Sequence, residues 1–257
     1  MIPFIQSTFS TKRKKAVWVS LGQSNMRPNT GVGGNSNTDT YPEGTLQWGR
    51  YLGNNNTLIP ATVPLDHWDN DDTPLFGPGL MTSFANQMKV AYPNEDIIFI
   101  PCAKGSSSFQ GGDWNQGDLY YNDMVARVNL CMSENPDFIF KGLLWHQGES
   151  DREASANYTA AITAFNSAWR SDINAASAES VFICGGLLSS WMDANPGGRI
   201  VNDSLIAFAA ATPYAAFASS EVPTILTGHD SVHFTSDGSL TLGERFALGY
   251  PIALNNN

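Results

Sequence analysis

Ser24 lies in a Gly-Gln-Ser-Asn-Met turn directly after a short apolar run, a placement that suits a nucleophile. The run, residues 16–21, is rich in β-branched and aromatic side chains and ends at Gly22, which predicts a buried strand of a parallel sheet. Ligands of open α/β sheets bind at the carboxyl edge of the strands, where this turn would present the hydroxyl. Most serines after strands are turn or helix-capping residues, so attack by this one requires a base within reach.

The candidate base is His233, near the C-terminus. Asp230 precedes it by three residues, so in a tight turn the carboxylate can reach Nδ1 and fix the tautomer whose Nε2 faces Ser24. Serine hydrolysis requires such a base, an acid that orients it, and donors for the oxyanion. The Asp-x-x-His spacing alone is a weak signal, but this pair also stands just before the last expected helix. The other histidines lack that combination: His67, His146 and His229.

Two carboxylates, Glu149 and Asp151, follow another apolar run in the segment His-Gln-Gly-Glu-Ser-Asp. The favoured interpretation is that both brace this loop by accepting backbone hydrogen bonds. Alternatively, Glu149 replaces or assists the acid that orients His233. Paired carboxylates also serve glycosidases, but a Ser–His nucleophile has no place in that mechanism.

The elements that must position these residues alternate along the chain. Apolar or β-branched runs predict strands at 16–21, 97–100, 138–145, 181–184 and 214–219. Apolar residues at helical spacing predict helices over 80–90, 119–132, 158–173, 200–211 and 236–248. No repeat or linker interrupts this order. We therefore expect a lead-in over 1–15, then a single α/β domain over 16–257 with a parallel sheet of about five strands and right-handed crossovers.

One long segment, residues 27–73, departs from this alternation and is rich in Asn, Gly, Thr, Asp and Pro. A loop of this length within a compact domain is uncommon and often functional. It either walls the site and stacks aromatic rings on a sugar, or is an ordered surface excursion anchored to the core by those rings. Its scattered aromatic residues are Tyr41, Trp48, Tyr51 and Trp68.

Composition restricts the class of partner. Hydrophobic residues make up 42% of the 257 residues and charged residues 15%, enough apolar residues for a core and too few charges for wholesale disorder. Four basic residues are clustered at 12–15, and the rest of the chain, with ten basic and 24 acidic residues, carries a net charge of −14. Such a surface repels phosphate backbones, so no nucleic-acid partner is expected.

The cysteines and the apolar runs of the chain bear on disulfides, metal sites and membrane spans. Cys102, Cys131 and Cys184 are widely spaced and odd in number, which favours buried free thiols, with one disulfide left open. No cluster with metal-ligand spacing is evident, so no metal site is expected. No apolar run reaches the ~18 residues of a membrane span, so we expect a soluble protein without a membrane partner. The sequence does not decide the oligomeric state or the compartment. An extracellular location and a place in an exported or virion assembly both stay open.

Four segments together resemble the SGNH hydrolases. They are Gly-Gln-Ser-Asn-Met at 22–26, Gly105, Trp-His-Gln-Gly-Glu-Ser-Asp at 145–151, and Asp-Ser-Val-His-Phe at 230–234, in that order. They look most like the branch with sialate O-acetylesterases and acetylxylan esterases, carbohydrate esterase family 6. The stretch from Gly105 to Met124 is also similar to that branch, and the resemblance spans residues 16–248.

The resemblance implies a three-layer, flavodoxin-like α/β/α fold and a role for each site residue. Ser24 is then the nucleophile, Asp230 and His233 complete a triad, and no cofactor is required. The oxyanion donors implied are the N–H groups of Ser24 and Gly105 and the side chain of Gln147. Most SGNH enzymes have Asn where Gln147 stands, and the usual Gly-Asp-Ser is here Gly-Gln-Ser; both departures favour the carbohydrate-esterase branch. Supporting roles are left for Gln23, Asn25 and Glu149.

The resulting hypothesis is a serine esterase that removes O-acetyl groups from carbohydrate through an acyl-enzyme. Two alternatives remain at this point. One is a catalytically silent carbohydrate-binding module of a surface or virion assembly that keeps an esterase scaffold. The other is a lipase or thioesterase of the same superfamily. The presence of every triad and oxyanion residue type counts against the silent module.

Overall fold

The computed structural model describes residues 13–27, 40–50, 55–68 and 77–257. A seven-stranded sheet runs through the molecule in the order β3-β2-β4-β1-β5-β6-β7. Five adjacent strands, from β4 to the edge strand β7, are parallel to one another: β4 (Glu95–Pro101), β1 (Lys14–Gly22), β5 (Phe138–His146), β6 (Val181–Gly185) and β7 (Ala215–Ala218). These are the five expected strands, and their order is the flavodoxin-like one.

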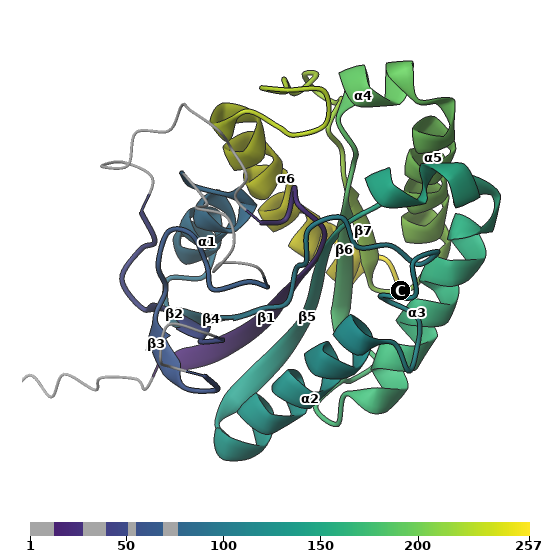
Figure 1. The fold of residues 1–257 in the computed structure, drawn as a ribbon. Coiled ribbons are helices and arrows are strands. Elements are labelled where there is room, and N and C mark those ends of the chain that lie inside the picture. Colours follow the sequence, from purple (N-terminus) through teal and green to yellow (C-terminus); the bar gives the residue numbers. More distant parts are fainter. Residues whose placement is uncertain (1–12, 28–39, 51–54, 69–76) are drawn as a thin grey trace, which may run out of the picture.

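Helices cover both faces of the sheet and complete three layers (Figure 1). On one face lie α1 (Leu80–Ala91) and α6 (Ser236–Asn255). The other face carries α2 (Leu119–Glu134), α3 (Tyr158–Asp172) and α5 (Pro196–Ala211). Two shorter helical segments were not expected from the sequence: a 3₁₀ segment, η1 (Glu149–Asn157), and α4 (Ser189–Ala194). The α/β class and the alternating order are confirmed.

The start of β1 and the end of α6 differ from the bounds expected from the sequence. Strand β1 begins at Lys14, so the last two residues of the expected lead-in pair with β4 instead of preceding the strand. Arg13, at the start of the described chain, forms an ion pair of 2.9 Å with Asp96. Helix α6 continues past Pro251 to Asn255, where the buried side chain of Ala253 keeps its last turn on the core.

The segment 27–73 contains two strands that the sequence analysis missed. Strand β2 (Thr45–Trp48) pairs parallel with β4, and β3 (Leu58–Pro60) pairs antiparallel with β2, extending the sheet on one edge. Both strands are short and lack a sustained apolar run, which explains why they were overlooked.

The described aromatics of this segment anchor it to the core. The Tyr41 ring lies 6.0 Å from that of Phe99, and Trp48 is buried. The Trp68 ring meets that of Tyr120 edge-on at 5.1 Å. These contacts match the anchoring interpretation, whereas Tyr51 falls outside the described residues.

Aromatic side chains also build the core on both faces of the sheet. Trp18 of β1 is fully buried, and its ring meets those of Phe84 and Tyr250 edge-on at 5.1 and 5.0 Å. The opposite face packs Trp145 of β5 against Phe165 at 4.9 Å. The cysteines Cys102, Cys131 and Cys184 are buried free thiols, as expected. Among the described helices, none combines the length and the apolar composition needed to cross a membrane.

Candidate active site

Ser24, His233 and Asp230 form one continuous hydrogen-bonded chain. His233 Nε2 lies 2.9 Å from Ser24 Oγ, and His233 Nδ1 lies 2.8 Å from Oδ2 of Asp230. The other carboxylate oxygen, Oδ1, accepts the backbone N–H groups of Val232 and His233 at 2.7 and 2.6 Å. The imidazole is therefore held between the acid and the hydroxyl in the orientation that a general base requires.

The carboxylate of Asp230 remains ionised at neutral pH. Partial burial alone would raise the pKa of Asp230, but hydrogen bonds from the His233 side chain and from two backbone N–H groups lower this pKa to about 2. An ionised carboxylate at this position accepts a hydrogen bond from Nδ1–H of His233 and can stabilise a positive charge on the imidazole.

The turn that presents Ser24 depends on a glycine. Gly22 has a φ of +124°, and a Cβ atom there would lie 2.0 Å from the backbone oxygen of His146. No other residue type fits so close to the neighbouring strand. The N–H of Gln23 donates to that same oxygen at 2.8 Å. The first loop, which follows β1, and the third loop, which follows β5, are thus in direct backbone contact.

The side chains on either side of Ser24 hold it to two other loops. Gln23 Oε1 accepts the backbone N–H groups of Gly148 and Ser150 at 3.4 and 3.2 Å. Asn25 is joined to the segment that carries His233: its Nδ2 donates to the oxygen of Val232 at 3.0 Å, and its Oδ1 accepts the N–H of Phe234 at 3.2 Å. Gln23 and Asn25 therefore fix the position of Ser24 relative to the segment that carries His233.

The second loop, which follows β4 and contains Gly105, is also hydrogen-bonded to the turn that carries Ser24. Lys104 N–H donates to the oxygen of Gly22 at 2.9 Å, and Ser107 Oγ donates to the same oxygen at 3.2 Å. Within the described part of the chain, neither Ser24 N–H nor Gly105 N–H donates a hydrogen bond to the protein. Both backbone donors are therefore available to a ligand atom.

Gln147, the third expected oxyanion donor, is fully buried, and both Oε1 and Nε2 of its side chain form hydrogen bonds. Its Oε1 accepts the hydroxyl of Tyr158 at 2.9 Å. Its Nε2 lies 2.7 Å from Oδ2 of Asp151 and 3.2 Å from both Oε1 of Gln23 and the oxygen of Ser107. The two N–H hydrogens thus already face three protein acceptors, and donation to an oxyanion would require one of these bonds to be given up.

The carboxylates of the third loop have separate partners. Asp151 accepts the N–H groups of Phe109 at 3.0 Å and Gln110 at 2.9 Å, so it braces the second loop as well as Gln147 of its own loop. Glu149 Oε1 accepts Nδ2 of Asn25 at 2.7 Å and lies 3.9 Å from Nδ1 of His146. The carboxylate hydrogen-bonded to His233 is that of Asp230, whereas Glu149 is joined through Asn25 to Val232 and Phe234, the two neighbours of His233.

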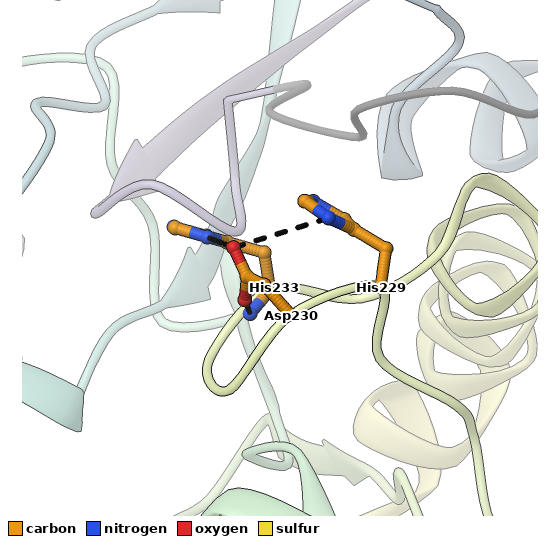
Figure 2. Close-up of side chains that lie close together, drawn as sticks. All are labelled: His229, Asp230 and His233. Atoms are coloured by element: carbon orange, nitrogen blue, oxygen red, sulfur yellow. Dashed lines mark hydrogen bonds and ion pairs between the residues drawn. The ribbon is translucent and has the colours of Figure 1, made fainter.

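His229, which the sequence analysis set aside, lies beside the triad. Its ring is nearly parallel to that of His233, with centroids 5.9 Å apart and an interplanar angle of 16°. Its Nδ1 lies 3.9 Å from Oδ2 of Asp230. Figure 2 shows the two imidazoles on either side of the carboxylate. The available signal was the sequence His-Asp-x-x-His, in which a second histidine directly precedes the acid.

Replacing Gln147 tests whether it stabilises the loops as well as the reaction. If Gln147 gives up one of its hydrogen bonds to donate to the oxyanion, Gln147→Ala should lower kcat about 10²–10³-fold with KM nearly unchanged. It should also lower the free energy of unfolding by about 1–3 kcal/mol, because buried acceptors lose their donor. Steady-state kinetics and urea unfolding measure the two effects. Loss of activity without loss of stability would contradict the bracing role, and a higher KM at constant kcat would instead indicate ground-state binding of the sugar.

Comparison with known proteins agrees with this architecture. A family model described as carbohydrate esterase, sialic acid-specific acetylesterase matches residues 14–251. The structure of NanS is similar over 96% of this chain and 99% of that chain, with a TM-score of 0.79 at 18% sequence identity. At that identity, the structural likeness shows the fold alone.

Two curated relatives match parts of the sequence. A probable 9-O-acetyl-N-acetylneuraminic acid deacetylase of Escherichia coli K12 is 30% identical over 74 residues, 23% of each chain. A probable carbohydrate esterase of Arabidopsis thaliana is 27% identical over 169 residues, 58% of each chain. The chain thus matches only these shares, less than two thirds, of the curated relatives' length. Because the family model covers nearly the whole sequence, the chain belongs to the carbohydrate esterase family of sialic acid-specific acetylesterases.

Proposed function

We propose that this protein hydrolyses O-acetyl esters of carbohydrate through an acetyl-enzyme on Ser24. The observation that carries the proposal is the chain of hydrogen bonds from Ser24 Oγ through His233 to Asp230, at 2.9 and 2.8 Å, in a member of this esterase family. Nucleophilic attack on a carbonyl carbon uses this arrangement: the hydroxyl contacts an imidazole, and a carboxylate orients that imidazole.

In the acylation half, Ser24 Oγ attacks the acetyl carbonyl carbon while His233 Nε2 takes the hydroxyl proton. The carbonyl oxygen becomes an oxyanion, which the free N–H groups of Ser24 and Gly105 can stabilise. His233 then returns the proton to the leaving sugar oxygen, the ester bond breaks, and the sugar departs with its hydroxyl restored. Asp230 offsets the positive charge that His233 carries between these two transfers.

In the deacylation half, water takes the place of the sugar hydroxyl. His233 removes a proton from that water, its oxygen attacks the acetyl carbon, and the bond to Ser24 Oγ breaks. The proton on His233 returns to Ser24, and acetic acid leaves. The contacts of Gln147, Gln23 and Asn25 support a positioning role in both halves, since these amides join the loops that carry the reacting groups.

The sugar proposed first is an O-acetylated sialic acid. The family description names sialic acid-specific acetylesterases, and the Escherichia coli relative is described as acting on 9-O-acetyl-N-acetylneuraminic acid. Acetylated xylan is the other carbohydrate that the resemblance of the four segments suggests.

The test compares acyl groups and sugars on purified protein. We expect p-nitrophenyl acetate to be cleaved in preference to the octanoate ester, and acetate to be released from a 9-O-acetylated sialic acid, with neither reaction in Ser24→Ala. Preference for the octanoyl ester would instead favour a lipase or thioesterase. No turnover of any ester by the folded protein would favour a silent carbohydrate-binding module.

A further inference from the structure

His229, Asp230 and His233 bring three metal-ligating side chains together at the outer side of the triad. Each residue has one ligand atom, a ring nitrogen or a carboxylate oxygen, that lies within 4.8 Å of the ligand atoms of the other two. The sequence analysis expected no metal site, yet the tight turn folds His-Asp-x-x-His so that both imidazoles flank one carboxylate (Figure 2). The cluster is open to solvent, with side-chain exposures of 25% for His229 and 41% for Asp230.

We propose that these three residues form an inhibitory site for Zn²⁺ or a similar divalent transition metal. Two imidazoles and one carboxylate are a donor set that zinc accepts, with water completing the coordination. The atoms that face each other are Nδ1 of His229 and Oδ2 of Asp230, 3.9 Å apart, and Nδ1 of His233 and the same oxygen, 2.8 Å apart. Exposed side chains can adjust these separations to the spacing that a tetrahedral ion requires.

Inhibition follows from which nitrogen of His233 the metal would occupy. Nδ1 faces Asp230, whereas Nε2 faces Ser24. A neutral imidazole has one ring proton, so binding of the metal at Nδ1 displaces the proton of that nitrogen, and the ring takes up a proton from solvent at Nε2. Nε2 then has no lone pair with which to take the proton of Ser24, and the carboxylate that oriented the ring is bound to the metal. A chain that holds zinc cannot begin acylation.

The first measurement uses wild-type protein dialysed against EDTA. Because the triad itself needs no metal, we expect esterase activity to survive chelation. Added Zn²⁺ should then lower kcat at least about tenfold with little change in KM, and EDTA should restore the activity. Mg²⁺ at the same concentration should have no effect, because it prefers oxygen ligands. Loss of activity on chelation, or activation by zinc, would overturn the proposal.

The second measurement compares variants of the same turn. His229→Ala leaves the triad in place, so its activity without metal should match the wild type. The zinc concentration for half-inhibition should rise about 10–100-fold or more, since even a residue that only supports a ligand contributes that much to affinity. Ser231→Ala, an exposed neighbour in the turn, is the matched control and should keep wild-type zinc sensitivity. Equal sensitivity in His229→Ala would place the inhibitory zinc elsewhere and contradict the proposal.

The activity readout rests on the proposed function, but binding of the metal does not. Equilibrium dialysis of Ser24→Ala with Zn²⁺ should give one ion per chain, and this ion should be lost in the double variant Ser24→Ala/His229→Ala. A protein without esterase activity that still shows this difference would retain the metal site and refute only the proposed function. Equal stoichiometry and affinity in the two proteins would refute the metal site.

Discussion

Ser24→Ala and His233→Ala should each lower kcat about 10³–10⁶-fold while leaving the fold intact. In the proposed mechanism, Ser24 supplies the oxygen that forms the acetyl-enzyme, and His233, whose Nε2 lies 2.9 Å from that oxygen, removes its proton. Because neither residue can perform its step without the other, the double variant should be barely worse than either single one. Steady-state kinetics with p-nitrophenyl acetate measures the three losses, and circular dichroism checks the fold.

A serine nearby in space provides the control for this comparison. Ser231→Ala removes a hydroxyl from the turn that carries His233, where the side chain is exposed, and should retain wild-type kcat. If the losses in Ser24→Ala and His233→Ala simply multiply in the double variant, the two residues do not act as a unit and the hydrogen bond between them is not used in catalysis.

Asp230→Asn should lower kcat by up to about 10⁴-fold with little change in shape. An amide in place of the carboxylate can present an N–H to Nδ1 of His233, which favours the tautomer with the proton on Nε2. That tautomer directs a donor instead of an acceptor at Ser24. The 2.8 Å contact between Asp230 and His233 is the structural basis for this effect.

Glu149→Gln is the matched carboxylate-to-amide change in the third loop. Glu149 accepts a hydrogen bond from Asn25 at 2.7 Å, whereas Asp230 is bonded to His233 itself, so loss of the Glu149 carboxylate should cost less than loss of the Asp230 carboxylate. Kinetics under identical conditions ranks the two variants. If Glu149→Gln is the more damaging by tenfold or more, the acid of the triad lies in the third loop and the role given to Asp230 is wrong.

The central sheet and the position of Ser24 were predictable because their signals are local. Residues 16–21 form an apolar run interrupted only by Ser20, and Gly22 permits a turn that no other residue type allows. Asp230 and His233 are three residues apart, so one tight turn suffices to join them. Strand β2, in contrast, has four residues and owes its place to pairing with β4. Nothing within its own sequence specifies that pairing.

The amide network around the site could not be predicted, because its contacts join residues that are far apart in the sequence. Gln147 contacts Gln23, which is 124 residues away in the sequence, and the oxygen of Ser107, which is 40 residues away. Residue type identifies a carboxamide that can donate, but only the folded chain reveals that three protein acceptors already surround it. His229 was overlooked because its position became informative only when the turn placed its ring beside His233.

The acetyl-enzyme on Ser24 can be observed directly. p-Nitrophenol is a good leaving group, so acylation by its acetate ester should outpace deacylation and the intermediate should accumulate. After rapid acid quench, mass spectrometry should find one added acetyl group per chain, on the peptide that contains Ser24, and none in Ser24→Ala. Turnover of the ester with no acetyl group on Ser24, or with the group on another residue, would contradict the serine mechanism.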